Sequence, residues 1–201
     1  MAKRNIPLNS LFDFVRFTHL FQKIERVILV PGKDRWENDA EHSYQLALVA
    51  WYVVTHEHLK LDLSKVVFLA LVHDLVEAYA GDTFIYDSPE VLSQKQKREE
   101  EAIKLLKKNF PDFTSLHSFI EEYEARKTAE SKFVYALDKF LPMINIYLDG
   151  GETWQRKEIT LEQIVENKTS RVAVYPELVP HFERLVKILK LEENNLFGKG
   201  K

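Results

Sequence analysis

The sequence lacks cysteine, contains few glycines and has no long apolar run. Without cysteine, the chain of 201 residues forms no disulfide bond and offers no thiolate for catalysis or metal binding. No apolar stretch approaches about 18 residues, the length that a membrane-spanning helix needs. The formal net charge of -3 is too close to neutral to indicate a nucleic-acid or membrane surface. The first residues, MAKRNIPLNS, do not resemble a signal peptide, so we expect a soluble cytoplasmic protein.

Helical patterns dominate what remains. With only six glycines and long segments whose apolar residues recur every 3.6 positions, the sequence predicts one all-α domain over residues 1–201. Start and stop signals predict helices at about 9–30, 38–58, 64–81, 88–110, 114–126 and 129–148, and two more that begin at Thr160 and Pro176. We expect the C-terminal helices, at about 160–195, to pack on a catalytic core formed by residues 20–150.

The predicted third helix carries three titratable side chains into an apolar pattern. Seven apolar residues, Val66 to Val72, precede His73, Asp74 and Glu77. A buried carboxylate without a partner is costly, so these groups need one. His73 and Glu77 are four residues apart and share a helix face, while Asp74 points about 100° away, near enough to reach a common ion.

Two more side chains of the kind that binds metals stand in apolar helical segments. His42 lies near the start of the second helix, and Asp138 lies within the sixth. Imidazole and carboxylate groups suit Mn, Fe, Co, Ni or Zn, and one such divalent ion would explain why the buried charges are tolerated. Each residue alone also has a simpler interpretation: a histidine that hydrogen-bonds within the core, or Asp138 as an ion-pair partner of Arg26, Lys132 or Lys139.

The order of these residues resembles a known superfamily. Glu41-His42, then His73-Asp74, then Asp138 is similar to the pattern of the HD-domain superfamily of metal-dependent phosphohydrolases. The segments RWENDAEHSYQLALVA, LALVHDLVEAYAGD and SKFVYALDKFLPM resemble the branch with the YfbR-type 5'-deoxynucleotidases and their eukaryotic relatives. The resemblance covers about residues 20–150. It implies a helical HD-domain bundle that removes phosphate from nucleoside 5'-monophosphates, deoxynucleotides among them, and homodimers are common in that family.

The resemblance also implies roles for individual residues. The implied metal ligands are His42, His73, Asp74 and Asp138. Glu77 would be the catalytic acid/base, and Asp82 would orient the substrate or the attacking water.

The phosphate-binding arginine of the family falls at about Arg26, with Lys33 and Arg35 as substitutes. The bacterial members have a tryptophan at the next position, where Val27 stands here, so we expect only a weak preference for deoxyribose. One arginine compensates the charge of a monophosphate. We therefore expect monophosphates to be hydrolysed faster than triphosphates.

Other functions remain as alternatives: a nucleoside triphosphohydrolase, a phosphodiesterase, or a metal-containing module that binds nucleotides without turnover. Two-metal phosphodiesterases need additional ligands near the first site, and the spare histidines His56 and His58 stand too far along the second helix. A module that only binds nucleotides would have no need for Glu77 and Asp82. These features favour one metal and an enzyme.

A proline inside the predicted sixth helix also concerns the site. Pro142 has no N–H to bond to the carbonyl of Asp138, four residues earlier. We expect the helix to bend there, so that the Asp138 side chain leans into the groove between helices. A tolerated kink without a role is the alternative.

Overall fold

The computed structural model describes residues 5–197 and consists of helices with one small hairpin. The first half of the chain contains α1 (Leu8–Phe21), β1 (Glu25–Leu29), β2 (Trp36–Asn38), α2 (Asp39–His56), α3 (Leu63–Val72), α4 (Glu77–Ala80) and α5 (Pro89–Asn109). The second half contains α6 (Thr114–Ala125), α7 (Ala129–Leu148), α8 (Glu152–Arg156), α9 (Leu161–Val172), the 3-10 turn η1 (Pro176–Leu178), α10 (Val179–Leu191) and α11 (Glu193–Leu196). The predicted all-α class is confirmed, with the hairpin as an addition.

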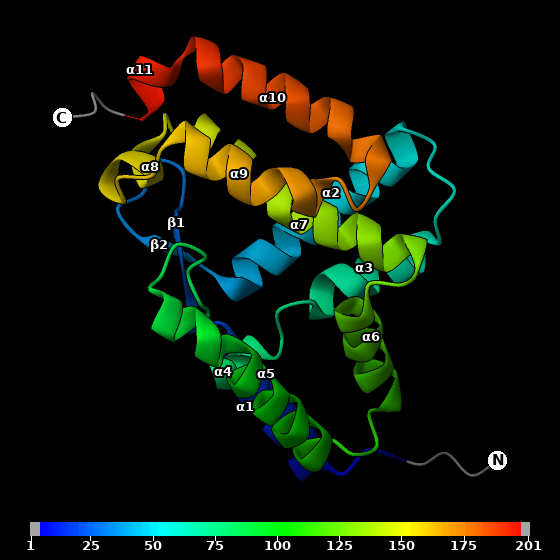
Figure 1. The fold of residues 1–201 in the computed structure, drawn as a ribbon. Coiled ribbons are helices and arrows are strands. Elements are labelled where there is room, and N and C mark those ends of the chain that lie inside the picture. The colour runs from blue at the N-terminus through cyan, green and yellow to red at the C-terminus, as the bar shows by residue number, and fades with distance from the viewer. Residues whose placement is uncertain (1–4, 198–201) are drawn as a thin grey trace.

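Two apolar cores hold the helices together. The larger lies between α2, α3, α7, α9 and α10, and the smaller joins α1 and α5 to α6 and to the segment after α3. Figure 1 shows α10 and α11 running across one end of the molecule above α9, with α1, α4 and α5 gathered at the other end. Within residues 5–197, no helix is both long enough and apolar enough to cross a membrane.

Several predicted helix starts have the side-chain caps that the sequence suggested. Asn38 accepts a hydrogen bond from the backbone of Glu41, whose side chain accepts one from the Asn38 backbone in return, so the start of α2 is fixed by a capping box. Thr160 forms the same arrangement at α9, and Ser88 followed by Pro89 begins α5. These caps stabilise backbone N–H groups that would otherwise lack partners.

The predicted first helix is too long. It ends at Phe21, and residues 25–29 form a strand that pairs antiparallel with Trp36–Asn38. The β-branched Val27 and Ile28 favour an extended backbone, and the turn after Val30 brings the second strand alongside. Ile28 falls within the helix predicted at about 9–30, but it lies in this strand and is buried in the larger core. The correction matters because β1 carries Arg26.

The predicted third helix is interrupted. It begins at Leu63, with Asp62 rather than Ser64 as N-cap, and ends at Val72. Residues 73–76 form tight turns in which Leu75 donates to Val72 and Glu77 to Asp74, before α4 begins. The His73 ring bonds to the Ala70 carbonyl, the group that a continuing helix would use. The segment therefore turns at the residues expected to bind metal.

Candidate metal centre

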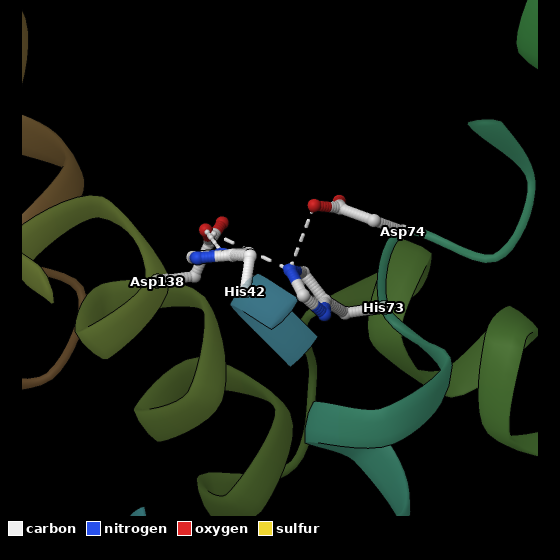
Figure 2. Close-up of side chains that lie close together, drawn as sticks. All are labelled: His42, His73, Asp74 and Asp138. Carbon is white, nitrogen blue, oxygen red and sulfur yellow. Dashed lines mark hydrogen bonds and ion pairs between the residues drawn. The ribbon is translucent and has the colours of Figure 1, made fainter. Parts of the chain in front are cut away.

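Four side chains from three parts of the chain converge at one point (Figure 2). His42 comes from the first turns of α2, His73 and Asp74 from the turn after α3, and Asp138 from the middle of α7. One nitrogen or oxygen atom of each lies within 4.8 Å of the others. His42, His73 and Asp138 are buried, and 14% of the Asp74 side chain is exposed. The structure thus brings together the four residues that the sequence singled out.

The His73 ring is held in one orientation. Its Nδ1–H donates to the Ala70 carbonyl at 2.8 Å, so Nε2 is the ring nitrogen that faces the carboxylates and can bind a metal once it has released its proton. Nε2 lies 2.9 Å from Asp74 Oδ2 and 3.7 Å from Asp138 Oδ1, yet it has no hydrogen-bond partner within residues 5–197. A ring fixed through one nitrogen, with the other aimed at two carboxylates, is the usual arrangement of a metal-binding histidine.

Asp138 is held by neighbours on two sides. Its Oδ1 lies 3.1 Å from His42 Nε2, and its Oδ2 accepts from the Tyr123 hydroxyl at 3.2 Å and pairs with Lys139 Nζ at 2.6 Å. The ion pair with Lys139 is one of the simpler roles that the sequence allowed for Asp138. Asp138 forms this ion pair through Oδ2 while its Oδ1 faces His42, so the two contacts occur together.

The donor set fits a divalent cation. His73 Nε2 is a buried atom without a hydrogen-bond partner in the described part of the chain, and His42 Nε2 lies 3.1 Å from Asp138 Oδ1. Burial of the His73 ring disfavours its charge, but Asp74 and Asp138 outweigh burial and raise its pKa to about 10. Burial lowers the pKa of His42 to about 4. The negative charge that holds a proton on His73 would equally attract a metal ion, and metal binding would release that proton.

Arg26 neutralises part of the acidic cluster. Its Nη1 lies 2.7 Å from Asp74 Oδ2 and 3.2 Å from Asp39 Oδ1, and its Nε lies 3.5 Å from Glu37 Oε2. A second acidic group, formed by Asp39, Asp74 and Glu77, has ligand atoms equally close together. Because Arg26 bridges Asp39 and Asp74, it already supplies a positive charge to that group. The structure therefore places Arg26 in the site.

Glu77 and Asp82 border the same space. Glu77 begins α4 and is only 4% exposed, and its Oε2 has no hydrogen-bond partner within residues 5–197. Burial, together with the charges of Asp74 and Asp82, raises the pKa of Glu77 well above its usual value. Gly81 ends α4 with φ +74°, which favours glycine, and turns the chain so that Asp82 lines the cavity beside Glu77.

A cavity of about 540 Å³ opens beside these residues. Arg26, Glu77, Asp82 and three of the four converging side chains line it, whereas Lys33 and Arg35 do not. Lys33 lies in an exposed turn, and Arg35 pairs with Glu41 on the surface at 2.6 Å. Neither residue expected as a substitute for Arg26 therefore reaches the site.

Besides Arg26, five cations within residues 5–197 line the cavity: Lys95, Arg126, Lys139, Lys168 and Arg171. The sequence singled out only Lys139 among them, as a possible ion-pair partner of Asp138. The expectation that one arginine supplies the positive charge is therefore wrong. A signal for Lys168 existed, because it lies in the buried stripe of α9 with Leu161, Ile164 and Val172. A charged residue in an apolar stripe is the feature that identified His73.

Comparison with known proteins identifies the family. A family model described as HD domain matches residues 21–179, and the chain belongs to this family. The chain is 32% identical over 193 residues to 5'-deoxynucleotidase HDDC2 of Bos taurus. The aligned residues cover 94% of this chain and 89% of that protein. The chain is also 31% identical over 194 residues to the Xenopus laevis protein of the same name, covering 95% and 91%.

A solved structure also has the same fold. The fold is similar to the crystal structure of a predicted metal-dependent phosphohydrolase from Magnetospirillum magnetotacticum MS-1, with a TM-score of 0.80 and 29% identity. The similarity covers 92% of this chain and 96% of that one. The resemblance found in the sequence is thereby confirmed for the family and its fold.

Proposed function

We propose that this protein is a metal-dependent 5'-nucleotidase that removes phosphate from nucleoside 5'-monophosphates, deoxynucleotides among them. In this proposal one divalent transition metal ion, Mn, Co, Fe, Ni or Zn, is bound by His42, His73, Asp74 and Asp138. The observation that carries it is the convergence of these four side chains, three of which line a cavity large enough for a nucleotide. The relatives named 5'-deoxynucleotidase support the substrate class.

In the proposed reaction the metal ion and the side chains have different roles. A divalent cation supplies Lewis acidity toward a phosphate oxygen and lowers the pKa of water. Arg26 is held by Asp39 and Asp74 through Nη1, so its Nη2 amino group remains to donate to a phosphate oxygen. This contact would orient the phosphate of the nucleotide in the cavity.

Glu77 is proposed as the acid/base. Its unbonded Oε2 would take a proton from the attacking water, or give one to the 5'-oxygen that leaves with the nucleoside. Lys95 Nζ, 3.6 Å from Glu77 Oε1, would limit the movement of the carboxyl group. Asp82 would accept from a substrate hydroxyl or from the attacking water. An enzyme uses both carboxyl groups, whereas a module that only binds nucleotides has no use for Glu77.

Sugar preference depends on the wall beside Arg26. Val27 lines the cavity, and Trp36, whose ring is covered by Lys157 at 5.1 Å, does not. A small valine leaves room for a 2'-hydroxyl. We therefore expect a preference for deoxyribose below about tenfold in kcat/KM, which corresponds to about 1.4 kcal/mol of transition-state free energy.

The test is phosphate release from matched deoxy- and ribonucleotides. The protein is stripped with a chelator and reloaded separately with Mn, Co, Zn or Mg, and 5'-monophosphates are compared with triphosphates and with a phosphodiester. Monophosphates should be the best substrates with at least one metal. No release with any metal, while nucleotides still bind, would identify a binding module instead. A thousandfold sugar preference would show that a residue other than Val27 excludes ribose.

A further inference from the structure

Lys168 is a buried cation without a partner. Only 7% of its surface is exposed, and within residues 5–197 its side chain forms no ion pair and no hydrogen bond. Burial and the nearby charge of Lys139 lower its pKa to about 7. A buried charge without a partner costs stability, so packing alone does not explain a lysine here.

The groups around Lys168 are donors that also lack partners. Arg171 lies three residues further along α9, lines the same cavity and forms no ion pair in the described part of the chain. The Tyr86 hydroxyl is buried without a hydrogen bond within residues 5–197, and Arg171 lies near enough for its charge to act on the pKa of Tyr86. Within the described residues, three side-chain donors without a protein partner, of which Arg171 is half-buried, thus line the cavity near one another.

This side of the cavity joins the metal centre through Lys139. Lys139 pairs with Asp138, and its charge acts on Lys168 from the facing helix. Together, α7 and α9 contribute three cations and a single carboxylate to the cavity lining. That carboxylate, Asp138, is already paired with Lys139, so the charges of Lys168 and Arg171 remain for a ligand.

We infer that Lys168, Arg171 and the Tyr86 hydroxyl form a second anion subsite, which binds a phosphate group other than the one that is hydrolysed. The ligands of this class are nucleotides with a second phosphate, either on the 5' chain or on the 3' oxygen. Cations and a phenolic hydroxyl supply the charge-assisted hydrogen bonds that a phosphate requires. The inference rests on the proposed function, because the first phosphate must lie at the metal centre.

Calorimetry tests the subsite directly. Manganese-loaded Glu77→Gln protein, chosen to slow turnover, is titrated with deoxyadenosine 5'-monophosphate, 5'-diphosphate and 3',5'-bisphosphate. At least one ligand with two phosphates should bind about tenfold tighter than the monophosphate, the gain expected from charge-assisted hydrogen bonds. The ligand that shows the gain identifies whether the second phosphate is on the 5' chain or the 3' oxygen.

Substitutions at Lys168 and on the surface separate the possibilities. Lys168→Met should abolish the gain and leave the dissociation constant of the monophosphate within about twofold. It should also raise the melting temperature of chelated protein, since a buried charge is removed, which shows that the variant is folded. Lys187→Met, at an exposed lysine on α10, should change neither property.

Equal binding of all three nucleotides, or a gain that survives Lys168→Met, would overturn the subsite. Failure of the proposed function has a different signature, namely no phosphate release from monophosphates by the wild-type protein. A protein that hydrolyses monophosphates but gains nothing from a second phosphate would retain the proposed function and lose only the subsite.

Discussion

Replacing Arg26 with methionine should destabilise the metal-free protein by about 3 kcal/mol. The guanidinium lies within 3.5 Å of three carboxylates, and its side chain is only 12% exposed. Removing one partner of a buried ion pair costs about 3–5 kcal/mol, because the other charge stays buried. Burial raises the pKa values of Glu37 and Asp39 to about 7, so both can take up protons once Arg26 is gone. Because protonation removes part of the uncompensated charge, we expect a loss of unfolding free energy near the lower end of this range.

The measurement is thermal or urea unfolding of chelated protein near pH 7. For a domain of this size each kcal/mol corresponds to about 2–4 °C, so the melting temperature should fall by about 6–12 °C. Arg35→Met is the matched control, because Arg35 also pairs with a carboxylate, Glu41, but is 51% exposed. Exposed pairs contribute about 0–1 kcal/mol. Equal losses in the two variants would refute the conclusion that Arg26 compensates a buried acidic cluster.

Four further substitutions test the proposed roles. His73→Ala and Asp74→Ala should each lose bound metal in elemental analysis and lose the rise in melting temperature that metal gives, and full occupancy in both would rule out their role as ligands. Glu77→Gln should retain metal and nucleotide in calorimetry but lower kcat by about 10²–10⁴-fold, whereas near-normal phosphate release would refute the acid/base role. Pro142→Ala should restore the hydrogen bond to the Asp138 carbonyl and weaken metal affinity modestly. An unchanged metal dissociation constant would favour the tolerated kink.

The sequence alone predicts that four side chains come together, namely His42, His73, Asp74 and Asp138, because buried titratable groups need partners. Each stands in a helical pattern of apolar residues, and a titratable group buried among such residues must find a partner. When several helices carry such groups, sharing one ion satisfies all of them at once. The caps of α2, α5 and α9 were visible for a similar reason, since their signals lie within four neighbouring residues.

The errors concern choices that local pattern leaves undetermined. Val27 and Ile28 suit either a helical stripe or a strand, and the choice follows from pairing with residues 36–38 beyond the loop. The end of α3 depends on a hydrogen bond from the His73 ring to the Ala70 carbonyl, which no periodicity reports. Yet both departures serve the site. The strand presents Arg26 to Asp74, and the turn lets His73, Asp74 and Glu77 face one cavity.

Lys168 shows why the rule about buried charges has to be applied with tertiary structure. A lysine in an apolar stripe usually buries its methylene stem and extends its ammonium group into water, so its place in the stripe is a weak signal in the sequence. A histidine or aspartate has no comparable stem, so in an apolar stripe its polar group is expected to be buried. Here α9 packs against α7, and the ammonium group of Lys168 meets a cavity that already contains Lys139. Only the packed structure shows that the ammonium group is buried without a partner among the described residues. The rule that a buried charge needs a partner, which identified the metal centre, then identifies Lys168 as part of a second ligand site.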